Sequence, residues 1–111
     1  MHESVAAFVR ELEALKQELF VDGRLEIVYS RFNRASIRLH INASLFIDIY
    51  CNTGNRRFDF SLIHSGKRIF GYDNLPEWHY HPVHKPERHV HCDEPSMRQV
   101  LEEMASVLRS L

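Results

Sequence analysis

The chain has 111 residues, the size of a single domain with one hydrophobic core. With 44% hydrophobic residues, 26% charged residues and a net charge of −1, its composition excludes a disordered protein. No stretch approaches the roughly 18 apolar residues of a membrane span, and the N-terminus lacks the features of a signal peptide. The two cysteines, Cys51 and Cys92, form no CxxC motif. We therefore expect a single cytoplasmic domain over residues 1–111, with no disulfide framework and no paired-cysteine zinc site.

The first predicted element is a helix. Apolar residues recur every three or four positions from Val5 to Leu19, Ser4 can cap the helix, and Asp22-Gly23 marks its end. The period then changes to two, which is typical of half-buried strands. This alternation predicts five strands, the last two joined by a Ser65-Gly66 turn: roughly 25–29, 37–41, 45–51, 58–62 and 67–72.

The rest of the chain predicts a long loop and a second helix. Residues 73–94 are interrupted by prolines and show no clear period, so we expect an irregular loop. Ser96 and Gln99 stand at capping-box spacing, beside an apolar stripe from Met97 to Leu108. The order predicts an α+β fold, a five-stranded antiparallel meander with both helices on one face.

The strand register follows from requiring the apolar residues to share the face beneath the helices. A three-residue loop that pairs Ile41 with Leu45 meets this requirement. On the opposite face, the same register predicts two cross-strand pairs: Arg38 opposite Asp48, and His40 beside Phe46.

The face away from the helices is predicted to be polar. Through the second hairpin, we expect Asp59 opposite Tyr72 and Ser61 opposite Phe70. The simplest interpretation is a solvated face whose charges pair, each exposed pair contributing about 0–1 kcal/mol. Residues 23–68 hold eight Arg and Lys against three acidic residues, which is compatible with a phosphate-bearing ligand but does not require one. The polar set is Arg38, His40, Asp48, Tyr50, Asp59, Ser61 and Tyr72.

A histidine-rich segment carries the clearest functional signal. Five of the eight histidines lie within residues 79–91, and a connection this long in a small domain is either functional or disordered. In a first interpretation, His79, His81 and His84 act as general acid and base in RNA cleavage. Arg38 or Lys85 would supply the cation at the phosphate, and no metal would be needed.

Two other interpretations stay open. In the second, the His-x-His pairs bind zinc or manganese, because each pair presents both rings on one side of an extended strand. Asp73, Asp48 or Cys92 could complete the ligand set. In the third, the segment is a polar surface loop whose histidines have no function. The ligands in the metal interpretation are His79, His81, His89 and His91.

Two short motifs resemble a known family. Asp73-Asn74 is followed by a proline and clustered histidines, and His84-Lys85 comes later. With a looser match that includes Arg38, Asp48 and Arg57-Phe58 and runs to the final helix, the chain resembles the TumE-like family of prokaryotic toxin–antitoxin modules. It departs from the family pattern in two places. Glu77-Trp78-His79 follows Pro76 where the family has Pro-His-His, and Asp59 and Ser61 stand where a Tyr-Ser-aromatic-His run is usual.

The resemblance implies a toxin, a neighbouring antitoxin with a DNA-binding fold, and an RNA target. Together with the histidines, it predicts a metal-independent endoribonuclease that acts on the polar face beneath the histidine loop. Arg38 would hold the phosphate, Asp48 would orient Arg38 or a histidine, and Asp73 would join the catalytic group. The predicted acid–base residues are His79, His81 and His84, and the predicted substrate-binding residues are His40, Tyr50, Arg57, Asn74 and Lys85.

Other roles are also compatible with the sequence. The alternative function is a metal-binding or RNA-binding module without turnover. Asp73 and Asn74 would also fix the loop, because short Asx side chains cap turns. We expect no membrane partner, and a homodimer is compatible with the sequence.

Overall fold

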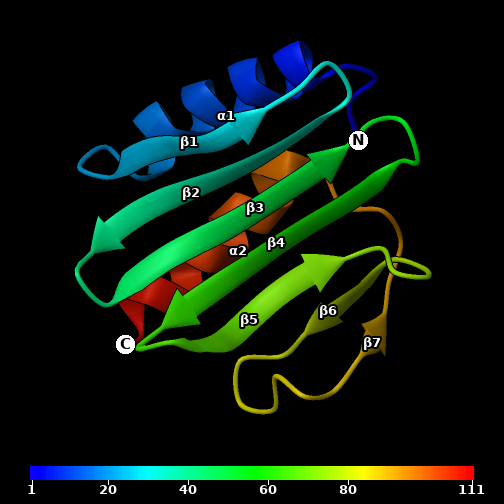
Figure 1. Cartoon of the computed structure of the whole chain (residues 1–111). Helices are drawn as coiled ribbons and strands as arrows, with labels where there is room; N and C mark the ends of the chain where they lie inside the picture. The colour runs from blue at the N-terminus through cyan, green and yellow to red at the C-terminus, as the bar shows by residue number, and fades with distance from the viewer.

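The computed structural model describes all residues, 1–111, as two helices and one antiparallel sheet. The seven strands follow one another in sequence order across the sheet, as Figure 1 shows. The predicted α+β class is confirmed, and the predicted count of five strands is wrong. The elements are α1 (Val5–Leu19), β1 (Arg24–Ser30), β2 (Arg34–Asn42), β3 (Leu45–Asn52), β4 (Arg57–His64), β5 (Lys67–Asp73), β6 (His79–His81), β7 (Val90–His91) and α2 (Met97–Arg109).

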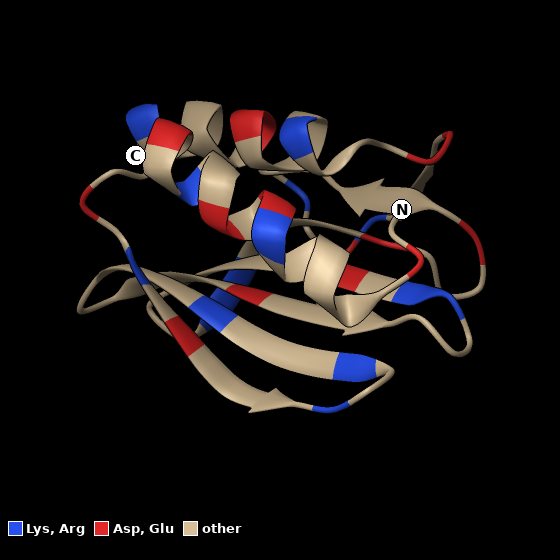
Figure 2. Cartoon of the chain, turned by 90° about the horizontal axis from the view of Figure 1, so that it is seen from above, with Lys and Arg blue, Asp and Glu red and all other residues tan.

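Both helices begin at capped residues. The Ser4 hydroxyl accepts a hydrogen bond from the Ala7 backbone N–H at 3.1 Å, and Ser96 accepts one from Gln99 at 3.0 Å. Figures 1 and 2 show both helices on the same side of the sheet. Neither helix has the length and apolar character needed to cross a membrane.

The core lies between the helices and the central strands. Alternate side chains of β2, β3 and β4 point toward the helices and are buried, and Phe8 of α1 packs against them. The Phe8 ring centroid lies 5.9 Å from those of both Phe58 and Phe60. The apolar patterns that predict the helices and strands also predict a core that contains the following six residues, and all six are buried: Leu12, Leu15, Ile47, Ile49, Phe60 and Leu101.

The register between β2 and β3 matches the prediction along most of its length. Arg38 is opposite Asp48, and His40 is opposite Phe46. At the turn, however, Leu45 pairs with Asn42 and not with Ile41, because the register shifts between His40 and Asn42. The side chain of Asn42 accepts a hydrogen bond from the Ser44 backbone N–H at 3.0 Å, which stabilises this shorter turn.

A bulge in β5 corrects the second predicted register. Leu62 pairs with Phe70 and Ile63 pairs with Arg68, so Ile69 has no partner on β4. One extra residue moves every later side chain to the opposite face. The predicted pairs of Asp59 with Tyr72 and Ser61 with Phe70 are therefore wrong: the pairs observed are Asp59 with Asp73, Ser61 with Gly71 and Phe60 with Tyr72.

Tyr72 consequently leaves the polar face. Its side chain is buried on the helical side, and its hydroxyl donates a hydrogen bond to the Glu103 carboxylate of α2. The other members of the predicted polar set stay on β2, β3 and β4.

The predicted loop over residues 73–94 contains the last two strands. β6 pairs with β5, and β7 pairs with β6. Strands of three and two residues are too short to produce a period that sequence analysis can detect. The histidine segment therefore extends the edge of the sheet and does not fold back over Arg38, as the ribonuclease interpretation required.

Candidate metal centre on the open face

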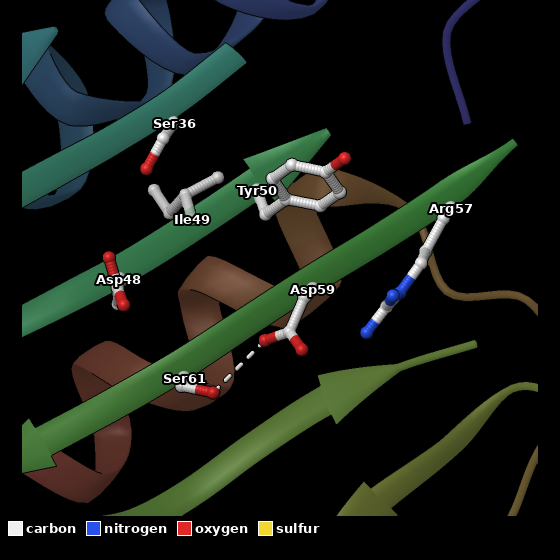
Figure 3. A pocket seen from close by; sticks show the side chains of 7 residues that line it. All are labelled: Ser36, Asp48, Ile49, Tyr50, Arg57, Asp59 and Ser61. Atoms are coloured by element: carbon white, nitrogen blue, oxygen red, sulfur yellow. Dashed lines mark hydrogen bonds between the residues drawn. The ribbon is translucent and has the colours of Figure 1, made fainter. Parts of the chain in front are cut away.

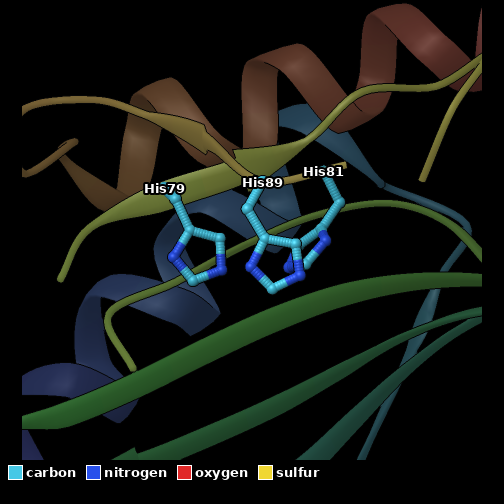
Figure 4. Close-up of side chains that lie close together, drawn as sticks. All are labelled: His79, His81 and His89. Carbon is cyan, nitrogen blue, oxygen red and sulfur yellow. The ribbon is translucent and has the colours of Figure 1, made fainter. Parts of the chain in front are cut away.

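Three histidines gather where β6 and β7 meet. His79 is paired with Asp73 and His81 with Gly71, so both rings point to the face opposite the helices, and Tyr80 between them points the other way. Figure 4 shows the rings of His79, His81 and His89 close together. Their candidate ligand atoms lie within 4.8 Å of one another.

Backbone carbonyls fix the orientation of two of these rings. Nδ1 of His79 lies 2.8 Å from the carbonyl oxygen of Glu77, and Nδ1 of His81 lies 3.0 Å from that of Pro86. A carbonyl oxygen only accepts hydrogen bonds, so we assign a hydrogen to Nδ1 in both rings. In each neutral ring, Nε2 is then left with a free lone pair.

Both Nε2 atoms turn toward the same carboxylate oxygen. Oδ2 of Asp73 lies 3.0 Å from Nε2 of His81 and 3.2 Å from Nε2 of His79. A carboxylate oxygen also offers only lone pairs, so neutral rings in these tautomers form no hydrogen bond with it. The arrangement requires either an additional proton on the rings or a cation held between the three groups.

Asp73 carries the negative charge that would attract either a protonated ring or a bound cation. Burial, the largest single effect, opposes ionisation of this side chain, but the His81 and His79 side chains and the Leu75 backbone N–H together outweigh it and hold the pKa of Asp73 below its usual value. Its other oxygen, Oδ1, accepts a hydrogen bond from the Leu75 backbone N–H at 3.0 Å. The carboxylate is therefore ionised at neutral pH and fixed in place.

His79 has an unsatisfied polar atom. Its Nε2 is buried and makes no hydrogen bond, because the nearby Asp73 oxygen is not aligned with it. Such an orphan group costs about 1–3 kcal/mol. The separations of 3.0 and 3.2 Å from Oδ2 are close to the roughly 3.3 Å edge of a tetrahedron built on zinc bonds of about 2.0–2.1 Å. The exposed ring of His89 stacks on that of His79, with their centroids 4.6 Å apart, and its candidate ligand atom lies within 4.8 Å of those of His79 and His81.

The remaining predicted residues of the segment lie outside this cluster. His84 and Lys85 are exposed, and Nδ1 of the exposed His91 lies 3.7 Å from the Glu77 carboxylate. Asn74 ties the segment to β4, because its side chain accepts a hydrogen bond from the Phe58 backbone N–H and donates one to the Arg56 carbonyl.

A shallow polar pocket of about 400 Å³ lies on the same face of the sheet, the face opposite the helices, which we call the open face. Figure 3 shows its lining side chains on β2, β3 and β4. Burial raises the pKa of Asp59, against the effect of the hydrogen bond that Ser61 donates to it at 3.0 Å. Nε of Arg57 is buried without a partner. The lining residues are Ser36, Asp48, Ile49, Tyr50, Arg57, Asp59 and Ser61.

The predicted phosphate-binding pair lies far from the histidines. Nε of Arg38 is 3.5 Å from Asp48, and its guanidinium lies 4.7 Å from the centroid of the Phe46 ring. Nε2 of His40 lies 2.7 Å from the Glu26 carboxylate. Four strand spacings separate β2 from β6, about 19 Å in all. The structure therefore brings together Asp73, His79, His81 and His89, and leaves Arg38, His40 and Asp48 in a separate group.

Comparisons with protein families, with curated proteins and with solved structures find no match to this chain.

Proposed function

We propose that the protein binds a divalent transition-metal ion, zinc in the first place, at the cluster of Asp73, His79, His81 and His89. The observation that carries the proposal is the convergence of two Nε2 lone pairs on one ionised carboxylate oxygen. Imidazole nitrogen and carboxylate oxygen are ligands that suit zinc.

The surroundings of the cluster also suit a metal. Histidine ligands almost always donate their other ring N–H to a carbonyl or carboxylate, and the carbonyls of Glu77 and Pro86 accept from His79 and His81 in this way. A bound ion would also give the buried Nε2 of His79 its missing partner. Such an ion supplies a Lewis acid and an activated water, beside a pocket open to solvent.

Isothermal titration of the metal-free full chain with zinc tests the proposal. We expect one equivalent to bind, and we expect His79→Ala and His81→Ala each to weaken binding by at least about 100-fold, because each removes a ligand. The matched controls are His84→Ala and His91→Ala, which remove exposed histidines outside the cluster and should leave the affinity unchanged. Equal affinity in all four variants, or no binding by the unaltered chain, would overturn the proposal.

A metal-independent endoribonuclease of a toxin–antitoxin module is the second candidate. The carboxylate–imidazole pair of Asp73 and His81, with the buried His79 beside it, favours this function. Two imidazoles in contact can serve as acid and base in one proton-transfer step, with Asp73 orienting them. His84 has no part in this version, because it lies outside the cluster.

RNA cleavage with and without EDTA separates the two candidates. For the metal-independent enzyme, EDTA leaves the rate unchanged, while His79→Ala and His81→Ala each lower it about 10²–10⁴-fold. If EDTA abolishes cleavage and zinc restores it, the metal is part of the reaction. Equal bacterial growth with the soluble protein expressed alone and with its neighbouring gene would exclude the toxin function.

A further inference from the structure

Two buried side-chain atoms lack a hydrogen-bond partner, and they lie on the same face of the sheet. They are Nε2 of His79 and Nε of Arg57. The proposed metal accounts for the first. The second is an N–H donor, so it requires an acceptor that the chain itself does not provide.

Arg57 is the one cation that lines the polar pocket. Its guanidinium lies 6.0 Å from the centroid of the Tyr50 ring and takes part in none of the ion pairs of the molecule. The phenol oxygen of Tyr50 accepts a hydrogen bond from the Asn52 amide at 3.2 Å, so its own hydrogen is free to donate. Ser36 adds a further hydroxyl to the lining. The pocket thus offers one buried N–H donor without a partner and two hydroxyls that can donate.

The negative charge in the pocket is partly neutralised. Asp48 forms an ion pair with Arg38, which leaves Asp59 as the carboxylate that opposes an anion. A cationic ligand would pair with Asp59 but would leave Nε of Arg57 buried and unsatisfied. An anion with several acceptor oxygens satisfies the guanidinium, whose fork of N–H groups matches a phosphate.

The pocket and the proposed metal site adjoin each other. Asp59 is directly opposite the metal ligand Asp73, and Arg57 is the next residue of β4 on the same face. Two strand spacings, about 10 Å, separate β4 from β6. One ligand of modest size can therefore contact both Arg57 and an ion at the histidines.

We propose that this pocket binds the phosphate group of a phosphate ester, with Arg57 as its main donor and the neighbouring metal facing another of its oxygens. Only the contact with the metal rests on the proposed metal-binding function, because the Arg57 contact needs no metal. The ligand class of the open face is thus an anionic ester that bridges a guanidinium and a divalent cation.

Binding of inorganic phosphate to the full chain, measured by titration calorimetry, tests the proposal with the metal-free protein and with the protein loaded with one equivalent of zinc. We expect Arg57→Gln to weaken phosphate binding about 10–100-fold, as the loss of a charged hydrogen bond does. We expect Asp59→Asn to strengthen it, because this change removes the opposing charge. Arg109→Gln is the matched control, since Arg109 is exposed and lies on α2, on the other side of the sheet from the pocket.

The two proposals fail in different measurements. The Arg57→Gln and Asp59→Asn variants should bind zinc within about threefold of the unaltered chain, so a zinc isotherm reports on the metal centre alone. Arg57-dependent phosphate binding without zinc binding would support the pocket and overturn the metal centre. Phosphate affinity that is equal in the unaltered chain, Arg57→Gln and Arg109→Gln would overturn the pocket, whether or not zinc binds. A normal thermal transition for each variant confirms that it is folded.

Discussion

Asp59 and Asp73 stand directly opposite each other on β4 and β5, so two carboxylates face the same side of the sheet one strand spacing apart. Their surroundings differ. Oδ2 of Asp73 is flanked by two imidazoles, whereas Asp59 receives one hydrogen bond, from Ser61. Burial, and then the charge of Asp73, raises the pKa of Asp59 despite that hydrogen bond. The charged form of Asp59 is therefore a cost to the folded state at neutral pH.

Replacing Asp59 with Asn should raise the thermal midpoint at neutral pH. Its pKa is higher in the folded than in the unfolded state, so its favourable contribution is complete at acidic pH and is lost as pH rises through the folded value. The gain from Asn should therefore shrink as the pH is lowered below that range. Thermal unfolding followed by circular dichroism at neutral and acidic pH measures both effects.

Asp48→Asn is the control for this comparison. Asp48 is paired with Arg38 and about half exposed, so its removal should change stability by less than about 1 kcal/mol and should not stabilise the protein. Stabilisation of the same size in both variants would indicate a general charge effect and not the local environment of Asp59.

Tyr72→Phe should destabilise the protein by about 1.5–3 kcal/mol, because it removes a hydrogen bond to a charged group, the Glu103 carboxylate, in a partly buried site. Tyr80→Phe is a close control. The ring centroid of Tyr80 lies 5.7 Å from that of Tyr72, and the Tyr80 hydroxyl makes no hydrogen bond. We expect it to change stability by less than about 0.5 kcal/mol. Chemical denaturation measures both values, and equal effects would contradict the role of the Tyr72 hydroxyl.

Tyr72 also marks the limit of what the sequence predicts. Two-residue alternation is enough to place Arg38 opposite Asp48, because nothing interrupts the ladder between them. The same reasoning fails beyond Ile69, because a bulge depends on local packing and leaves no mark on the apolar pattern. The one-residue shift moves Tyr72 into the core and brings Asp73 opposite Asp59.

The candidate site was predictable in part for a similar reason. His-x-His spacing indicates that His79 and His81 share a face once the segment is extended. It does not indicate which residue faces them, because Asp73 reaches them through pairing of β5 with β6. The spacing also treats His89 and His91 alike. The pairing of β6 with β7 places His91 directly opposite His79, yet the His91 ring lies beside Glu77, and it is the ring of His89 that joins the cluster.

The Cys51 thiol should react slowly with alkylating reagents in the folded protein. Burial raises its pKa to about 11, and the thiolate is the reactive form. A pKa about two above the ordinary value lowers the fraction of thiolate roughly 100-fold. The poor access of the reagent to the buried thiol slows the reaction further. Mass spectrometry after iodoacetamide treatment at mildly alkaline pH measures the reaction. Unfolding in denaturant should restore the rate, and equally fast labelling in both states would contradict the burial of Cys51.

Zinc should protect the edge of the sheet from local unfolding. β6 and β7 have three and two residues, so few backbone hydrogen bonds hold them, and the three proposed histidine ligands lie on β6 and just before β7. An ion bound to both segments stabilises the conformation in which β6 and β7 are paired with the sheet. The gain is about 2.7 kcal/mol when free zinc is 100 times its dissociation constant. We therefore expect zinc to slow amide hydrogen exchange about 100-fold at residues 79–81 and 90–91, with little change in β2 and β3. EDTA should reverse the protection, His81→Ala should abolish it, and His91→Ala should retain it. Protection spread evenly over all seven strands, or unaffected by His81→Ala, would mean that zinc acts elsewhere on the protein.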